Sequence, residues 1–134
     1  MTPFEYTPFP GPSQERTRQL FINNPLVRVM PDVPDRLLSI MFAGCSDMKQ
    51  ICETRLPGEL RDLAVLNCEK LASLPSLPDG LKYLRINECP LLTKLPPLPA
   101  SLQYLWLSNL PLLSGTVSSS IPNVYVEACP GLDA

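Results

Sequence analysis

The chain has 134 residues, of which 45 % are hydrophobic, so it is the size of a single domain with enough apolar side chains for a core. Its 11 Lys and Arg stand against 13 Asp and Glu, and a net charge of −2 provides no basic field for nucleic acid or anionic lipid. The sequence contains no histidine, which excludes Ser-His-Asp and Cys-His catalytic systems and histidine-ligated metals.

The N-terminal segment is predicted to be a disordered tail followed by a capping helix. Residues 1–12 include four prolines and are expected to be an extended, disordered tail, with docking onto a groove-bearing partner as the alternative. Ser13 is a candidate N-cap for a short helix that ends at Ile22, with Glu15 in its first turn. We expect residues 13–30 to form this capping helix and a linker, and the apolar end of the helix to cover the first strand edge.

Residues 31–134 contain a repeat. The spelling L-x-x-L-x-L-x-x-C occurs in five blocks that start 19 to 23 residues apart. Counting each block start as position 0, positions 3 and 5 are apolar in every block, and position 8 is cysteine in four of the five. The block starts are Leu37, Leu60, Leu81, Leu102 and Ile121. Such a period predicts a stacked solenoid, for which about three repeats suffice, and a partial sixth unit can precede the five.

Each block is expected to form one short strand over positions 0 to 6. Strand alternation sends positions 3 and 5 inward, and positions 2, 4 and 6 outward onto a concave face. Successive strands then stack in parallel about 4.8 Å apart. The segments between blocks, such as Leu91 to Pro99, contain too many prolines for helices, so extended, polyproline II or 3-10 structure is expected on the convex side.

The repeat spelling also carries a family resemblance. Leu74-Pro75-Ser76-Leu77-Pro78 nearly recurs as Leu95-Pro96-Pro97-Leu98-Pro99, each a few residues before a block. This L-P-x-L-P pattern resembles leucine-rich repeat proteins over roughly residues 30–132, in particular short-repeat type III secreted effectors of bacterial pathogens and the repeats of plant intracellular immune receptors. The resemblance implies an α/β fold: a right-handed leucine-rich repeat solenoid with a parallel β-sheet on its concave face and a short N-terminal capping helix.

The position-8 cysteines are expected to be structural. Cys45, Cys68, Cys89 and Cys129 lie in one line, so they cannot converge on a tetrahedral zinc ion, and their parallel Cβ directions disfavour disulfides. Their S–H groups can instead donate to loop carbonyls. Cys52 lies off this line and is the thiol expected to be most exposed. We therefore expect no metal, no cofactor and a reducing compartment.

No catalytic constellation emerges from the remaining polar residues. The carboxylates of Asp62, Glu88 and Glu127 lie in different blocks and form no obvious acid-base pair. The six glycines are scattered, so no phosphate-binding loop is present. We expect no catalytic residues and no enzymatic activity.

The outward positions of the blocks are the informative surface. The only tryptophan and three of the four tyrosines project there together with one arginine, and these residue types are enriched in binding hot spots. The alternative is that aromatic side chains pack across the strands only for stability. The candidate partner-binding residues on the concave face are Tyr83, Arg85, Tyr104, Trp106 and Tyr125.

These observations favour a non-enzymatic protein–protein interaction module, and the resemblance implies a bacterial effector-like protein that acts on a host target. The alternative is a structural or assembly protein that self-associates through an uncapped C-terminal strand edge, so the chain is expected to be a monomer or such a dimer. No apolar run reaches the ~18 residues of a membrane span, and no classical signal peptide precedes the repeats. We expect no membrane and no nucleic acid as partner, and a cytoplasmic location or delivery into a host cell without a classical signal peptide.

Overall fold

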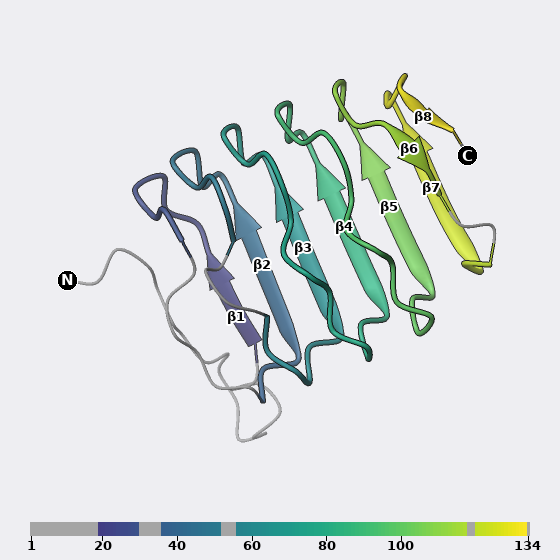
Figure 1. The fold of residues 1–134 in the computed structure, drawn as a ribbon. Helices are drawn as coiled ribbons and strands as arrows, with labels where there is room; N and C mark the ends of the chain where they lie inside the picture. Colours follow the sequence, from purple (N-terminus) through teal and green to yellow (C-terminus); the bar gives the residue numbers. More distant parts are fainter. Residues whose placement is uncertain (1–18, 30–35, 52–55, 118–119, 134) are drawn as a thin grey trace.

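The computed structural model describes residues 19–29, 36–51, 56–117 and 120–133. Six parallel strands lie side by side in one sheet, and the chain returns between them across one side of it (Figure 1). In sheet order they are β1 (Gln19–Ile22), β2 (Ser39–Ala43), β3 (Asp62–Leu66), β4 (Tyr83–Asn87), β5 (Tyr104–Ser108) and β7 (Asn123–Glu127). The short strands β6 (Gly115–Thr116) and β8 (Leu132–Asp133) form a second parallel pair. The described chain is a parallel β-solenoid.

The strand register aligns the five predicted blocks without a slip. Each inward residue pairs with its equivalent in the next block, and each outward residue does the same, from β2 through to β7. The row at position 3 consists of Ile40, Leu63, Leu84, Leu105 and Val124. The predicted parallel sheet is therefore confirmed, with β2, β3, β4, β5 and β7 each occupying positions 2 to 6 of a block.

The core is one continuous cluster between the sheet and the returns. Positions 0, 3, 5 and 8 are buried in every block from the one at Leu37 to the one at Leu102. Position 11, on the return, adds a further row that the repeat spelling did not predict: Met48, Leu71, Leu92, Leu113 and the partly buried Leu132. Each fully buried side chain of this kind stabilises the fold by about 1.5–3 kcal/mol, so the rows together account for the cohesion of the stack.

A left-handed backbone conformation ends every strand from β2 onward, except the short β6 and β8. Position 7 has a positive φ in all five blocks, close to 55–70°. Its occupants are Gly44, Asn67, Glu88, Asn109 and Ala128. Glycine and asparagine adopt this conformation readily, whereas Glu88 and Ala128 pay a steric cost for it. This turn redirects the chain so that the position-8 side chain points into the core.

The last four residues of the expected N-terminal capping helix form a strand instead. Residues 19–22 form strand β1, which pairs in parallel with β2, so the helix prediction is wrong for these four residues. Leu20 and Ile22 are buried while Phe21 between them is exposed, and this period of two fits a strand. By pairing with β2, the segment satisfies backbone groups that a helix would have left at an open edge.

The rest of that prediction cannot be matched to structure. Residues 1–12, the helix start at 13–18 and Cys52 lie outside the described residues. Within the described ranges no residue is helical, so the α part of the expected α/β class has no counterpart there and the secondary structure is all β. It follows that the described part also has no helix that could cross a membrane. The proline-rich returns over 71–78 and 92–99 contain neither helix nor strand.

Candidate functional site

The outward face of the sheet carries the five candidate residues as two neighbouring rows. Tyr83 pairs with Tyr104 in the position-2 row, on β4 and β5. Arg85, Trp106 and Tyr125 follow one another in the position-4 row, on β4, β5 and β7. All five are exposed, and the four aromatic residues retain between 40 % and 46 % of their accessible surface. We call this set the aromatic strip.

The rings of the aromatic strip pack against one another in pairs across strands. The Trp106 and Tyr125 ring centroids lie 4.3 Å apart with the planes inclined at 37°, and those of Tyr83 and Tyr104 lie 6.2 Å apart at 39°. The ring planes of both pairs are tilted rather than stacked face to face, as aromatic pairs prefer, and the Trp106–Tyr125 pair is the closer of the two. Each ring therefore buries one part against a neighbour and leaves another part open to a partner.

A short hydrogen-bond chain holds the indole of Trp106. Its Nε1 donates to Oγ of Ser108 over 3.2 Å, and the Ser108 hydroxyl donates to Oδ1 of Asn87. Asn109 Nδ2 donates to the same Asn87 oxygen over 3.1 Å. Ser108 is almost fully buried, so its two hydrogen bonds are partly shielded from competing water. The ring is thus oriented before any partner arrives, which lowers the entropy lost on binding.

Arg85 lies beside a carboxylate that is short of partners. Oδ1 of Asp62, on β3, is buried, and no hydrogen-bond donor reaches it within the described residues. This burial raises the pKa of Asp62, and the positive charge of Arg85 acts in the opposite direction. The Arg85 guanidinium thus places a positive charge close to the Asp62 side chain, at the β3–β4 edge of the aromatic strip.

No family model, curated protein or solved structure matches this chain.

The cysteine row proves to be structural in its contacts. Cys45, Cys68, Cys89 and Cys129 are free and buried, and each Sγ lies within 3.4–4.0 Å of a backbone carbonyl to which it can donate. Cys45 Sγ, for example, donates to the carbonyl of Ile22 on β1 over 3.5 Å. No group of three or more candidate metal ligands forms in the described ranges.

Neighbouring thiols also set one another's ionisation. The contact with Cys68 and then burial raise the pKa of Cys45 far above its ordinary value. Cys68 interacts with thiols on both sides: the contact with Cys45 lowers its pKa, but the contact with Cys89 and burial outweigh this and raise the pKa to about 11. The Cys68 thiol in turn lowers the pKa of Cys89, against the effect of burial. Cys45 and Cys68 are thus protonated at neutral pH and are poor nucleophiles.

Two features of the outward face were missed by the sequence reasoning. Phe21 on β1 pairs with Met41 and extends the position-4 row to the other end of the sheet, with 41 % of its surface exposed. The helix prediction concealed it, although Leu20 and Ile22 show the same spacing as positions 3 and 5 of a block. Asn87 and Ser108 at position 6 were assigned to the face, but their role in orienting Trp106 was not foreseen.

Proposed function

We propose that this protein is a non-enzymatic protein–protein interaction module of the leucine-rich repeat type, which binds a protein partner through the aromatic strip. The observation that carries the proposal is the register of β4, β5 and β7, because it gathers four exposed rings and one guanidinium on adjacent strands. Aromatic and arginine side chains dominate protein–protein hot spots. A partner can cover the open parts of rings that are already oriented.

A bacterial effector-like role inside a host cell belongs to the same proposal. It is supported by the resemblance of the L-P-x-L-P repeats to secreted effectors and by four reduced, buried thiols, which suit a reducing compartment. The absence of histidine from the sequence supports a binding rather than a catalytic role. We propose that neither nucleic acid nor a membrane is the partner, in keeping with the net charge of −2.

The test compares matched variants in affinity capture from host-cell lysate, followed by a direct affinity measurement on the captured protein. Trp106→Ala should weaken binding by about 2 kcal/mol or more, roughly 30-fold in Kd. Leu112→Ala is the matched control, because Leu112 is a large exposed apolar residue on a return rather than on the sheet face. Equal affinity of Trp106→Ala and the parent, or an equal loss in Leu112→Ala, would refute the assignment.

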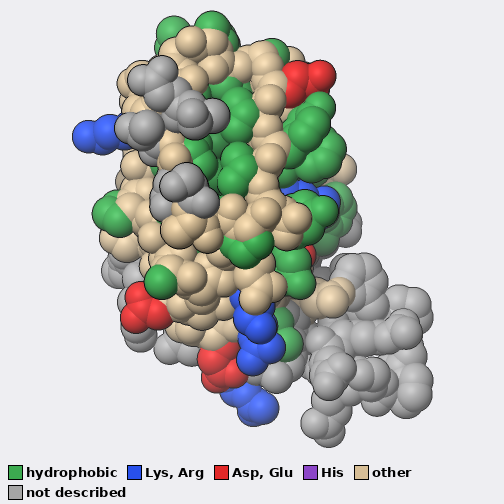
Figure 2. Space-filling view, turned by 90° about the vertical axis from the view of Figure 1, so that its right-hand side faces the viewer, with side chains coloured by type: hydrophobic (Ala, Val, Ile, Leu, Met, Phe, Trp, Pro, Cys, Tyr) green, Lys and Arg blue, Asp and Glu red, His purple; other side chains and the backbone are tan. Residues whose placement is uncertain are grey.

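A second candidate is self-association through the edge at β7. In the described chain β7 is the last strand of the sheet, and Val124, at an inward position, is 40 % exposed. Figure 2 looks onto this end of the solenoid and shows hydrophobic side chains in the middle of the face. An unpaired parallel edge beside exposed apolar groups is a template for a second strand.

Sedimentation at several protein concentrations separates the two candidates. Edge pairing predicts that the measured mass rises with protein concentration. It also predicts that the Val124→Lys variant has the mass of the monomer at every concentration. Binding through the aromatic strip alone predicts a monomer throughout, with partner affinity unchanged by Val124→Lys.

A further inference from the structure

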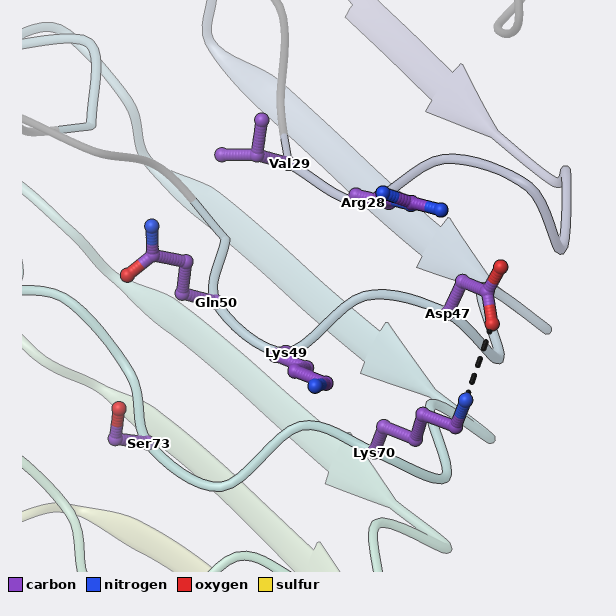
Figure 3. A pocket seen from close by; sticks show the side chains of 7 residues that line it. All are labelled: Arg28, Val29, Asp47, Lys49, Gln50, Lys70 and Ser73. Atoms are coloured by element: carbon purple, nitrogen blue, oxygen red, sulfur yellow. Dashed lines mark hydrogen bonds and ion pairs between the residues drawn. The ribbon is translucent and has the colours of Figure 1, made fainter.

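A polar site lies on the returns, on the side of the sheet away from the aromatic strip. Arg28, Lys49 and Lys70 line a hollow of about 700 Å³ together with one carboxylate, Asp47 (Figure 3). We call it the basic pocket. Arg28 follows β1, Lys49 follows β2 and Lys70 follows β3, so three successive turns of the solenoid each contribute one cation.

The charges of the basic pocket are only partly balanced. Lys70 Nζ donates to Asp47 Oδ1 over 3.2 Å. Asp47 is the one carboxylate among the lining residues, and it is therefore already paired with Lys70. Neither Arg28 nor Lys49 has an ion-pair partner among the residues that the structure describes. Within the described residues, a protein of net charge −2 thus keeps two cations without an ion-pair partner in one concave site. Such a local excess of positive charge attracts anions.

The basic pocket has a charged end and a neutral end. In Figure 3 the side chains of Arg28 and Lys70 extend toward the end that carries Asp47, and Lys49 lies in the middle. Val29, Gln50 and Ser73 lie at the other end. The volume is far larger than an inorganic phosphate needs and falls in the range of small-molecule sites. The amide of Gln50 and the hydroxyl of Ser73 supply donors and acceptors for an uncharged polar group.

We propose that the basic pocket binds the phosphate ester of a small hydroxylated molecule, of the sugar phosphate class. Arg28 and Lys49 hold the phosphoryl group, Arg28 by paired N–H donors and Lys49 as a point charge. The hydroxylated part lies over Val29, between Gln50 and Ser73. Arg28 and Lys49 come from adjacent returns and line the same hollow. This inference is independent of the function proposed for the aromatic strip.

The test is a titration of the full chain with glucose 6-phosphate, glucose and inorganic phosphate, followed by NMR of the backbone amides. It is run at an ionic strength of about 0.01 M, where the Debye length is about 30 Å and exposed charges are least screened. Glucose 6-phosphate should shift the amide signals of Arg28 and Lys49 and bind at least 10-fold more tightly than either glucose or inorganic phosphate. Equal affinity for inorganic phosphate, or equal affinity for glucose, would overturn the proposal.

Variants test the location of the site, because removing cations should weaken glucose 6-phosphate binding and removing the carboxylate should strengthen it. The double variant Arg28→Gln, Lys49→Gln should weaken glucose 6-phosphate binding at least 10-fold, whereas Lys94→Gln, a lysine on a later return, should leave it unchanged. Asp47→Asn removes the competing carboxylate and frees Lys70, so it should tighten binding about 3-fold. Loss of binding in Asp47→Asn, unchanged binding in the double variant, or binding of the chain to phosphatidylserine vesicles but not to glucose 6-phosphate would each contradict the proposal.

Discussion

Strands β4 and β7 occupy equivalent places in their blocks, yet their surroundings differ. Leu84 on β4 and Val124 on β7 both stand at position 3, but Leu84 has 0 % of its surface exposed and Val124 has 40 %. The difference arises because, within the described residues, β4 has a strand on each side, whereas β7 pairs with β5 alone. In a solenoid the burial of a side chain depends on the neighbouring turns as much as on its own place in the repeat.

The aromatic strip runs from the inner strand β4 to the edge strand β7. Tyr83 and Arg85 stand on a strand whose inward residues are fully buried. Tyr125 stands on a strand whose inward residue Val126 is only partly buried. We therefore expect the inner end of the aromatic strip to be anchored more firmly than its β7 end, because local opening is easiest where few apolar contacts hold a segment.

The largest expected effect tests the comparison directly. Leu84→Ala should lower the free energy of unfolding by about 3–4 kcal/mol, because it leaves a cavity in a fully covered core. Val124→Ala should cost less than about 1 kcal/mol, since solvent already reaches that side chain. Urea denaturation followed by circular dichroism measures both values. Similar costs for the two variants would show that β7 is covered as well as β4.

The buried thiols of Cys45 and Cys68 should make the stability of the protein depend on pH. The pKa values of Cys45 and Cys68 are raised in the folded protein, so the folded chain holds these protons more tightly than the unfolded chain. Unfolding then releases protons, and stability falls as the pH rises above the ordinary thiol value of 9.0 toward about 11. The loss should be about 2 kcal/mol or more, because one pKa unit corresponds to about 1.4 kcal/mol.

Denaturation at several values of pH between 8 and 11, under reducing conditions, checks this dependence. Cys68→Ala should make the stability curve flatter in that window. The lowered pKa of Cys89 acts in the opposite sense: it makes stability rise with pH up to about 9.0 and adds no further slope above that value, so the window above pH 9.0 isolates Cys45 and Cys68. A stability that stays constant from pH 9 to 11 in the parent protein would contradict the thiol contacts described above.

A smaller effect is expected from the contacts between the paired aromatic rings. A double-mutant cycle on Trp106 and Tyr125 should give a coupling energy of about 0.5–1.5 kcal/mol, since the rings are in close offset contact. The same cycle on Tyr83 and Tyr104, whose centroids are 6.2 Å apart, should give a smaller value. Each cycle compares the free energy of unfolding of the parent, the two single alanine variants and the double alanine variant, measured by urea denaturation. A larger coupling in the Tyr83 pair would reverse the expected order of the two contacts.

The smallest expected effect lies in the turns that follow the strands. Glu88 is exposed and adopts a positive φ of 57°, a conformation that asparagine tolerates better. Glu88→Asn should raise the free energy of unfolding by about 0.5 kcal/mol. Ala128→Asn, after the edge strand, should raise it by less, because this turn can open locally before the chain unfolds. The reverse change Asn67→Ala is the control, and any gain in stability from it would count against this account of position 7.

Much of the architecture was accessible from residue spacing. The period of 19 to 23 residues, with apolar side chains at positions 3 and 5, is sufficient to predict stacked parallel strands, because strand alternation and stacking leave one arrangement that buries all of them. The same alternation assigned Trp106 and its neighbours to the outward face and the position-8 cysteines to the core. These are local properties, set by each block on its own.

Other features depend on contacts between turns, and spacing alone does not reveal them. Residues 19–22 form a strand because the edge of β2 offers hydrogen-bond partners, a long-range contact that outweighed the helix signals before them. The exposure of Val124 and the support of Trp106 by Asn87 arise in the same way. The basic pocket gathers Arg28, Lys49 and Lys70 from three returns far apart in sequence. Local alternation therefore specified the rows of the solenoid, while neighbouring turns decided which rows are covered and which charges meet.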